Sequence, residues 1–376
     1  MEQVTLIATA AFGLEAVVAR EIQALGYGDT RVENGRVTFT GDLMALCRAN
    51  LWLRCADRVL LKLGEFPATS FEELFEGTKA LDWPLWLPPD ATFPVQGKAV
   101  KSQLKSVPDC QAIVKKAVVE KMKERYHQSW FAENGPRYKI EVALLKDRVT
   151  LTLDASGQGL HKRGYRQLSG AAPLKETLAA AMVNLSRWQP ERALIDPMCG
   201  TGTIPIEAAL LGLNQAPGMQ RSFDAENWPN LPRQLWLLAR QEAADLLQRE
   251  RRLTIRGSDI DRKAVAMARS HAARAGLENQ IHWQQAPLAE LRTRQKNGCL
   301  ISNPPYGERL EDLAKVKRLY LELGEVYRSL EAWSCYILTS HKDFERSIGR
   351  KADKKRKLYN GRIQCDFYQF FGKKPE

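Results

Sequence analysis

Hydrophobic and polar positions follow two different rhythms along the chain, and the change comes near residue 160. Up to that point, short strand-like runs, amphipathic helices and turn signals predict small α+β units. Beyond it, apolar strand-like runs alternate with helical patterns, which predicts a mostly parallel sheet with covering helices. The expected strands of that sheet are residues 193–197, 253–259, 281–286, 298–303 and 333–340.

The first 155 residues read as two units. The first contains Asn34-Gly35, a strong hairpin signal. In the second, a capping-box pattern begins at Ser70, a long helix runs from about residue 108 to 126, and two strands surround Lys146-Asp147. The expected domains are therefore residues 1–60, 61–155 and 160–376.

The last segment departs from the parallel pattern. Asn360-Gly361 is a second Asn-Gly turn, placed between two strand-like runs. Two strands joined by so short a turn cannot run parallel to each other. We therefore expect an antiparallel C-terminal hairpin, with the last strand at or near one side of the sheet.

Charge is unevenly distributed over the 376 residues, whose formal net charge is +12. Residues 98–125 hold eight basic against three acidic side chains, and residues 341–376 hold eleven against five. Residues 1–60 are slightly acidic, with six against seven. Two separate basic segments favour a polyanionic partner, most often nucleic acid, over a generally basic surface kept for solubility.

Composition also excludes several classes of protein. The seven cysteines are widely spaced with no CxxC pair, and the five histidines are dispersed, so we expect reduced thiols and no metal site. No apolar run is long enough for a membrane helix. The N-terminus carries an acidic residue where a secretory signal would be basic. The expectation is a cytoplasmic protein without membrane association.

The stretch ALIDPMCGTGTIPIEAA, residues 193–209, joins a buried strand to a helix through a glycine turn. Gly200 and Gly202 allow close backbone approach to a ligand, and the helix start offers free N–H groups to an anion. The position of the third dinucleotide-binding glycine is Pro205, and the next strand-end acid comes 57 residues after Gly202. A small anion such as a carboxylate suits the turn better than a pyrophosphate, and packing alone is the competing interpretation.

The stretch LTIRGSDIDRKAV, residues 253–265, provides that acid. Asp259 at the strand end can accept hydrogen bonds from both hydroxyls of a ribose, and Ile260 can lie against an adenine ring. Asp261 is interpreted as a helix N-cap.

A third strand ends in Asn303-Pro304-Pro305-Tyr306, at the edge where open α/β sheets hold ligands. The Asn303 amide oxygen and a backbone carbonyl braced by proline form two acceptors, which suit a planar –NH₂ group stacked on Tyr306. Such an amine is a weak nucleophile, and orientation next to an activated methyl group is the help that it needs most.

Together, these three motifs resemble those of the class I S-adenosylmethionine-dependent methyltransferases that modify exocyclic amines. The motifs are Asp-Pro-x-Cys-Gly-x-Gly-Thr, Gly-Ser-Asp-x-Asp and Asn-Pro-Pro-Tyr. Gly307-Glu308-Arg309-Leu310 and residues 161–182 narrow the resemblance to the 23S rRNA guanine-N2 methyltransferases with a THUMP domain, in the form without a second methyltransferase domain. This family implies a Rossmann-like methyltransferase domain preceded by ferredoxin-like and RNA-binding THUMP domains.

The resemblance also implies roles for individual residues. Thr177 and the 173–178 turn would close over the cofactor, S-adenosylmethionine. The expected cofactor-binding residues are Asp196, Pro197, Gly200, Gly202, Thr203, Asp259, Ile260, Gln285, Ala286 and Asn303. The expected catalytic residues are Asn303, Pro304, Pro305 and Tyr306.

The resulting prediction is methylation of the N2 amine of a guanine in ribosomal RNA, and the family resemblance implies 23S rRNA. Three alternatives remain open: a DNA adenine-N6 methyltransferase, a protein-glutamine methyltransferase, and a non-catalytic RNA-binding assembly factor. Two segments also keep two interpretations each. Residues 162–166 either bind RNA or pack as a linker, and residues 212–250 either line an RNA cleft or form a structural cap.

Overall fold

The computed structural model describes residues 3–166, 174–307 and 310–372, except for the side chains of 310–313. It divides into two compact units, each built around its own seven-stranded sheet. The first unit comprises residues 1–10, 19–160 and 222–242, and the second comprises residues 11–18, 161–221 and 243–376.

The first unit contains one continuous sheet with the strand order β2-β3-β1-β4-β7-β6-β5. Every neighbouring pair is antiparallel except β5 and β6. The strands are β1 (Val4–Ala10), β2 (Thr30–Glu33), β3 (Arg36–Gly41), β4 (Ala56–Pro67), β5 (Val95–Val100), β6 (Lys139–Leu145) and β7 (Arg148–Asp154). The helices are α1 (Glu15–Ala24), α2 (Leu43–Trp52), α3 (Phe71–Lys79), the 3-10 turn η1 (Trp83–Leu85) and α4 (Val107–Tyr126).

The long strand β4 joins the two small units that the sequence predicts. Its first half pairs with β1, and its second half pairs with β7 across an irregularity between Lys62 and Gly64. The expected boundary between residues 60 and 61 therefore lies inside a strand. The residues around this boundary resemble the end of one unit and the start of the next, but in the structure they form a single twelve-residue strand, β4.

Local predictions in this unit are confirmed. Asn34-Gly35 joins β2 to β3, and Lys146-Asp147 joins β6 to β7 with both residues in the left-handed region. Ser70 caps α3, since its hydroxyl accepts from the Glu73 backbone while the Glu73 carboxylate accepts from the Ser70 backbone. These are short-range features that depend on residues close together in sequence.

Residues 222–242 belong to the first unit and include η2 (Asp224–Asn227) and most of α7 (Arg233–Asp245). The Trp228 ring stacks on Tyr138 with 4.7 Å between ring centroids, and its indole N–H donates to the Arg137 carbonyl at 2.8 Å. Asn230 donates to the Leu85 carbonyl at 2.8 Å. Of the two interpretations of residues 212–250, these contacts favour the structural one for this part.

The second unit contains a sheet with the order β10-β9-β8-β11-β12-β14-β13. The first five strands are parallel, as predicted. The strands are β8 (Leu194–Asp196), β9 (Ile255–Asp259), β10 (Ile281–Gln285), β11 (Cys299–Ser302), β12 (Ser334–Thr339), β13 (Lys354–Asn360) and β14 (Ile363–Phe370). The helices are α5 (Glu176–Leu185), α6 (Thr203–Gly212), α8 (Arg262–Arg274), the 3-10 turn η3 (Leu288–Glu290), α9 (Leu310–Ser329) and α10 (Phe344–Ile348).

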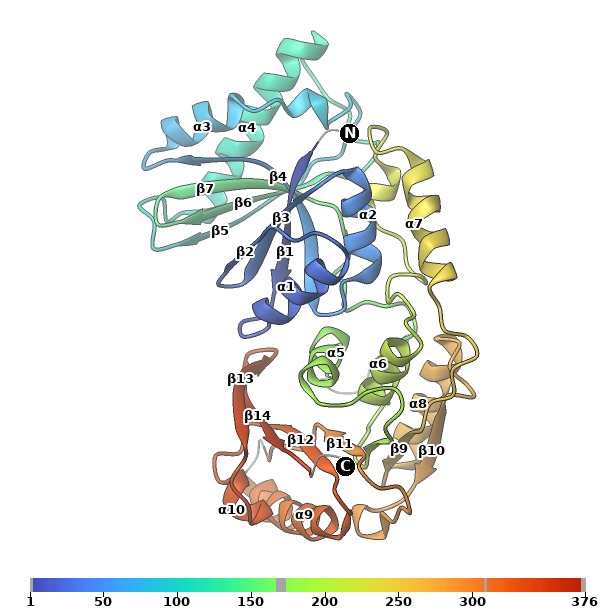
Figure 1. Ribbon diagram of the computed structural model, residues 1–376. Coiled ribbons are helices and arrows are strands. Elements are labelled where there is room, and N and C mark those ends of the chain that lie inside the picture. The colour runs from blue at the N-terminus through green and yellow to red at the C-terminus, as the bar shows by residue number, and fades with distance from the viewer. Residues whose placement is uncertain (1–2, 167–173, 308–309, 373–376) are drawn as a thin grey trace. The chain divides into compact units, whose positions relative to one another are not determined.

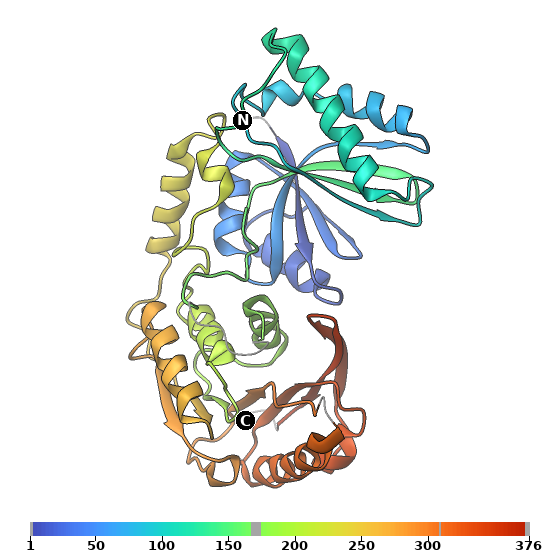
Figure 2. The same cartoon turned by 180° about the vertical axis from the view of Figure 1, so that it is seen from behind.

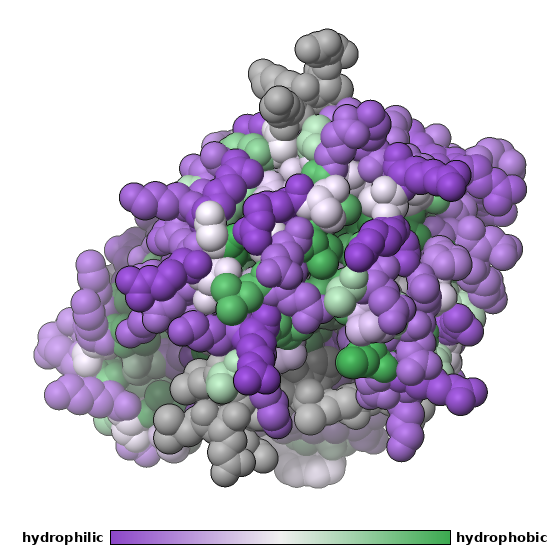
Figure 3. Space-filling view, turned by 90° about the horizontal axis from the view of Figure 1, so that it is seen from below, coloured by the Kyte–Doolittle hydropathy of each residue, from purple (hydrophilic) through white to green (hydrophobic). Residues whose placement is uncertain are grey.

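Helices cover both faces of this sheet, with α5, α6 and α8 on one side and α9 and α10 on the other (Figures 1 and 2). On the α9 side, Tyr320 and Leu323 are fully buried against Leu300 and Ile337 of the central strands. The outer surface of the α9 and α10 layer is mainly polar. The view from below shows mostly hydrophilic residues there, with small separate hydrophobic spots (Figure 3). The five neighbouring strands from β10 to β12 are parallel, so their carboxyl ends share one edge.

The predicted antiparallel hairpin is confirmed. β14 pairs antiparallel with β12 on one side and with β13 on the other, so β13 is the edge strand. The last pair of the hairpin is Asn360 with Ile363, which leaves Gly361 and Arg362 as the two-residue loop. Gly361 has φ of 62°, whereas Asn360 lies outside the left-handed region. The loop conformation thus depends on Gly361 and makes no special demand on Asn360.

Candidate active site

The three motif-bearing strands lie side by side in the sheet, in the order β9-β8-β11. Their carboxyl ends border a cavity of about 740 Å³. Eight of the predicted site residues line it: Pro197, Gly200, Asp259, Ile260, Asn303, Pro304, Pro305 and Tyr306. The three separate stretches therefore meet at one cavity. Nine further residues complete the lining: Lys175, Met198, Pro287, Leu288, Leu319, Glu322, Asn360, Gly361 and Ile363.

The two glycines of the turn have different surroundings. Both adopt left-handed backbone conformations, with φ of 51° at Gly200 and 85° at Gly202. A Cβ atom on Gly200 would meet nothing within 4 Å, whereas one on Gly202 would lie 2.6 Å from the Trp283 ring and 2.9 Å from Ala268. Gly200 is therefore open toward the cavity, and Gly202 allows α6 to begin in close contact with the packed interior.

Asp259 connects two of the motifs. One carboxylate oxygen accepts from the Gly200 backbone N–H at 2.8 Å, and the other accepts from the Asp261 N–H at 2.9 Å. Each oxygen keeps a free lone pair for a further donor. The neighbouring Ile260 side chain is 71% exposed and provides an apolar surface at the cavity. The predicted N-cap is confirmed, because the Asp261 side chain accepts from the Lys263 N–H at 2.8 Å.

Asp196 is the last residue of β8, is only 1% exposed and does not line the cavity. Its Oδ1 atom accepts from the Ser302 hydroxyl at 2.6 Å and from the Met198 N–H at 3.2 Å. Burial raises the pKa of this carboxyl to about 7, although the Ser302 hydrogen bond acts in the opposite direction. Through these two hydrogen bonds, Asp196 connects the start of the glycine turn to Ser302, the residue directly before Asn303.

The Asn303-Pro304-Pro305-Tyr306 segment is held from both sides. Pro304 is buried and Pro305 is exposed. The Tyr306 hydroxyl donates to the Asn303 side-chain oxygen, and the Tyr320 hydroxyl of α9 donates to the Pro305 carbonyl at 2.8 Å. No described residue donates to the Asn303 backbone carbonyl. Both acceptors of Asn303 are therefore able to take a further donor, the amide oxygen through its second lone pair.

Other predicted residues do not line the cavity. Gln285 donates to the Ile260 carbonyl at 3.3 Å, and the Ala286 N–H donates to the Asp259 carbonyl at 3.0 Å. Thr177 is buried in α5, and Thr203 is buried at the start of α6. Residue 173 of the predicted 173–178 turn and residues 308–309 of the extended motif lie outside the described residues.

The segment 162–166 packs within the second unit. Arg163 is 3% exposed, and its guanidinium lies 3.2 Å from the Glu207 carboxylate of α6, to which the Tyr165 hydroxyl also donates. Arg166 donates to the Thr203 hydroxyl and forms an ion pair with Glu176 of α5. These contacts favour the linker interpretation for Arg163, Tyr165 and Arg166, which hold the starts of α5 and α6 together.

Comparison with known proteins identifies the chain's relatives. Residues 163–369 match the family model described as RMKL-like, methyltransferase domain, which is more than half of the chain. Residues 5–60 match the RlmL ferredoxin-like domain, and residues 68–154 match the THUMP domain. The chain belongs to the RMKL-like methyltransferase family.

Relatives of the family match over nearly their whole length. YpsC of Bacillus subtilis (strain 168), named as a proposed RNA methyltransferase, is 51% identical over 99% of this chain and 97% of its own. The crystal structure of SMU.472, a proposed methyltransferase complexed with SAH, is 48% identical with a TM-score of 0.95 over 100% of both chains. A predicted N6-adenine-specific DNA methylase from Listeria monocytogenes str. 4b F2365 is 54% identical, with a TM-score of 0.96 over 99% of this chain and 97% of its own.

These matches confirm the predicted fold, the family resemblance, and the broad prediction of an S-adenosylmethionine-dependent RNA methyltransferase with a THUMP domain. The chemistry of the cavity also fits that cofactor. Asp259 offers acceptors for a ribose diol, Ile260 offers an apolar surface for an adenine ring, and Gly200 leaves room for close approach.

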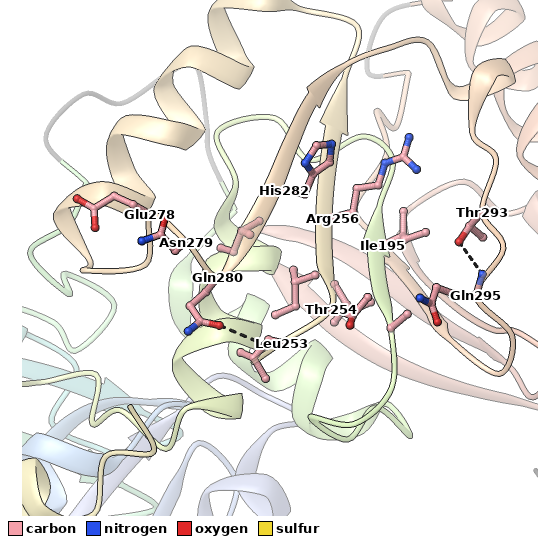
Figure 4. A pocket seen from close by; sticks show the side chains of 14 residues that line it. Ile195, Leu253, Thr254, Arg256, Glu278, Asn279, Gln280, His282, Thr293 and Gln295 are labelled. Carbon is pink, nitrogen blue, oxygen red and sulfur yellow. Dashed lines mark hydrogen bonds between the residues drawn. The ribbon is translucent and has the colours of Figure 1, made fainter. Parts of the chain in front are cut away.

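The opposite edge of the RMKL-like domain contains a second, smaller hollow of about 430 Å³ (Figure 4). It is bordered by the first residues of β8, β9 and β10, and Figure 4 shows Glu278, His282 and Thr293 among its lining. Between β10 and β11 the chain contains only η3, so Arg256, His282 and Gln284 on one face of β9 and β10 remain partly or fully exposed. None of the predicted site residues lines this hollow.

No helix among the described residues is long and apolar enough to cross a membrane. Within the same residues, no three His, Cys, Asp or Glu side chains are grouped so that they could hold a metal ion.

Proposed function

We propose that this RMKL-like methyltransferase transfers a methyl group to the exocyclic N2 amine of a guanine in ribosomal RNA, with 23S rRNA as the substrate. The observation that carries the proposal is the shared cavity at the carboxyl ends of β8, β9 and β11. It brings the predicted ribose acceptor Asp259 and the predicted amine acceptor Asn303 to one site. The motif extension after Tyr306 and residues 161–182 support guanine N2 within this family.

Asn303 would orient the amine. Its amide oxygen and its backbone carbonyl would each accept one N–H of the planar –NH₂ group, while the Tyr306 ring would pack against the base. The nitrogen lone pair would then face away from both acceptors. A fixed direction of attack matters for this amine, because conjugation with the ring makes it a poor nucleophile.

The bound cofactor supplies a methyl group on a positively charged sulfur. The guanine nitrogen oriented by Asn303 would displace sulfur from this methyl group, and S-adenosylhomocysteine would be the leaving product. The nitrogen carries the positive charge until it releases one proton to water. We assign no general base to this step.

Asp196, Asp259 and Gly200 would prepare the cofactor side. The Gly200 N–H and the Asp259 carboxylate fix each other at 2.8 Å, so the ribose acceptor is held in place before binding. Asp196 supports the same turn from below through Met198 and supports Asn303 through Ser302. The proposed cofactor and amine sites are thus linked by hydrogen bonds.

RNA binding by the first unit is supported by the THUMP match and by its basic side chains. Much of the positive charge on α4 is internally compensated, since Lys115, Lys121 and Lys123 form ion pairs with Glu133, Glu124 and Glu120. The loop after β5 contributes Lys101 and Lys105, which have no ion-pair partner among the described residues. We infer that this loop contacts phosphates more strongly than the helix does.

A DNA adenine-N6 methyltransferase is the second candidate. The name of the Listeria relative favours it, and adenine N6 is also a planar exocyclic amine. The THUMP match in the first unit favours RNA. Nucleoside identity therefore decides between the two candidates.

The test compares cells that lack this protein with cells complemented by wild type, Asn303→Ala or His282→Ala. Mass analysis of nucleosides from ribosomal RNA should show one N2-methylguanosine lost in the deletion strain and restored by wild type and His282→Ala. Asn303→Ala should reduce its level about a hundredfold or more, because the amine hydrogen bond to the side-chain oxygen is lost and the remaining bond to the backbone carbonyl does not fix the direction of attack. RNA binding should persist.

Two results would contradict the proposal. Loss of N6-methyladenine from DNA with unchanged ribosomal RNA would support the DNA enzyme. Unchanged modification of both nucleic acids would support a binding protein.

A further inference from the structure

The β13–β14 hairpin contributes residues to the cavity wall. Its Asn360-Gly361 sequence is typical of a hairpin turn, but the turn does not account for both residues. Asn360, Gly361 and Ile363 all line the cavity beside Tyr306. The turn needs only Gly361 in the left-handed region, and Asn360 is a paired strand residue. Its side chain is therefore available for another role.

That side chain makes one hydrogen bond of functional interest. The Asn360 Nδ2 atom donates to the Tyr306 hydroxyl oxygen at 3.3 Å, and the Tyr306 hydroxyl donates to Asn303 Oδ1. The Cys365 side chain of the same hairpin also lies against this hydroxyl. Residues that are 54 positions apart thus form a continuous chain that ends on the proposed amine acceptor.

The direction of this chain matters. A tyrosine hydroxyl has one proton and can point it to either neighbour. An amide N–H from Asn360 occupies a lone pair of the hydroxyl, so the tyrosine proton is left for Asn303 or for Cys365. The amide oxygen of Asn303 is a stronger acceptor than the thiol sulfur, which directs the proton to Asn303. This in turn fixes the Asn303 amide with its oxygen, rather than its –NH₂ group, toward Tyr306.

We propose that Asn360 is a positioning residue for methyl transfer, which sets the donor direction of Tyr306 and thereby the orientation of the Asn303 amide. This inference rests on the proposed role of Asn303 as the acceptor for the substrate amine. A reversed amide would present two N–H groups to an incoming –NH₂ group, and donors do not pair with donors. The terminal hairpin is then part of the catalytic arrangement as well as the sheet edge.

The test uses Asn360→Ala and Asn360→Asp, with Gln364→Ala as the control in an exposed position of the same hairpin. Asp has the shape of Asn but accepts a hydrogen bond, so it would draw the tyrosine proton away from Asn303. We expect kcat for methylation of RNA from a deletion strain to fall about fivefold in Asn360→Ala and more than about tenfold in Asn360→Asp. SAH affinity and thermal midpoint should remain close to wild type, as for Gln364→Ala.

A double-mutant comparison separates positioning from a structural role. Tyr306→Phe keeps the ring and removes the hydroxyl, so Asn360→Ala and Asn360→Asp should add nothing in that background. Full additive losses in the Tyr306→Phe background would overturn the inference, as would a parallel loss of SAH affinity.

A neutron crystal structure, which distinguishes the amide oxygen from the –NH₂ group, provides a readout that is independent of turnover. In Asn360→Asp with SAH, the Asn303 amide should be reversed or should have left the Tyr306 hydroxyl, and an unchanged Tyr306–Asn303 hydrogen bond would contradict the inference. The methylation assay measures transfer to any base, so an unexpected product nucleoside would count against guanine N2 alone. Loss of coupling between Asn360 and Tyr306 would count against the positioning role alone.

Discussion

The two edges of the parallel sheet in the methyltransferase domain are built from the same strands but differ in what they hold. At the carboxyl edge, Asp196, Asp259 and Asn303 are buried or tied into hydrogen bonds around the larger cavity. At the amino edge, His282 and Glu278 border the smaller hollow and are exposed to solvent. Open α/β sheets hold ligands at the carboxyl edge. The hollow at the amino edge is therefore not evidence of a ligand site.

The largest contrast between the two edges should appear in cofactor binding. Asp259→Ala removes the proposed ribose acceptor and the partner of the Gly200 N–H, and hydrogen bonds to a charged group contribute about 1.5–3 kcal/mol each. We expect SAH affinity to fall about a hundredfold or more, measured by titration calorimetry.

His282→Ala at the amino edge is the matched control, and we expect its affinity for SAH to stay within about twofold of wild type. Similar losses in both variants would mean that the carboxyl edge is not the cofactor site. A loss in neither would remove Asp259 from the binding residues.

Within the carboxyl edge, the two glycines of the turn should respond differently to the same change. Both are left-handed, so alanine introduces a similar backbone strain of about 1 kcal/mol at each. Gly202→Ala also forces a methyl group against Trp283 and Ala268, and we expect a total loss of about 2–3 kcal/mol in the free energy of unfolding.

Gly200→Ala should cost only the strain, because its methyl group points into open space at the cavity. Its main effect should be weaker binding of SAH. Denaturant unfolding and calorimetry on the pair check both expectations, and equal stability losses would show that the turn closes around Gly200 as tightly as around Gly202.

Much of this arrangement could be predicted from the sequence because it depends on short-range patterns. The strand ends at Asp196, Asp259 and Asn303 each follow a buried apolar run, and parallel strands place such ends at a common edge. The Asp261 cap and the C-terminal hairpin likewise depend on neighbouring residues. The family motifs added the identity of the cofactor.

The remaining features depend on contacts between residues far apart in sequence. The packing role of Gly202 requires Trp283, and the hydrogen bond of Asn360 requires Tyr306. The sharing of β4 by two apparent units requires its pairing with both β1 and β7. No local pattern encodes such pairings. The Asn-Gly turn signal accounts for Asn360 as a turn residue but gives no indication of its hydrogen bond to Tyr306.

The last expected effect depends on pH and concerns the buried carboxyl of Asp196. Burial raises its pKa from 3.8 to about 7. Between these values the folded protein keeps a proton that the unfolded chain has released, so stability falls as the pH rises through this window. Above pH 7 the carboxyl is ionised in both states, and the penalty no longer grows.

Asp196→Asn keeps the shape and stays neutral, so its stability should exceed that of wild type by a margin that widens between pH 5 and 7. The slope should be about 1 kcal/mol per pH unit and should level off above pH 7, as measured by denaturant unfolding at each pH. Ser302→Ala removes a hydrogen bond that favours the charged form, and the decline in its stability should therefore continue to higher pH. A margin between Asp196→Asn and wild type that does not change with pH would show that Asp196 is already ionised in the folded protein at pH 5.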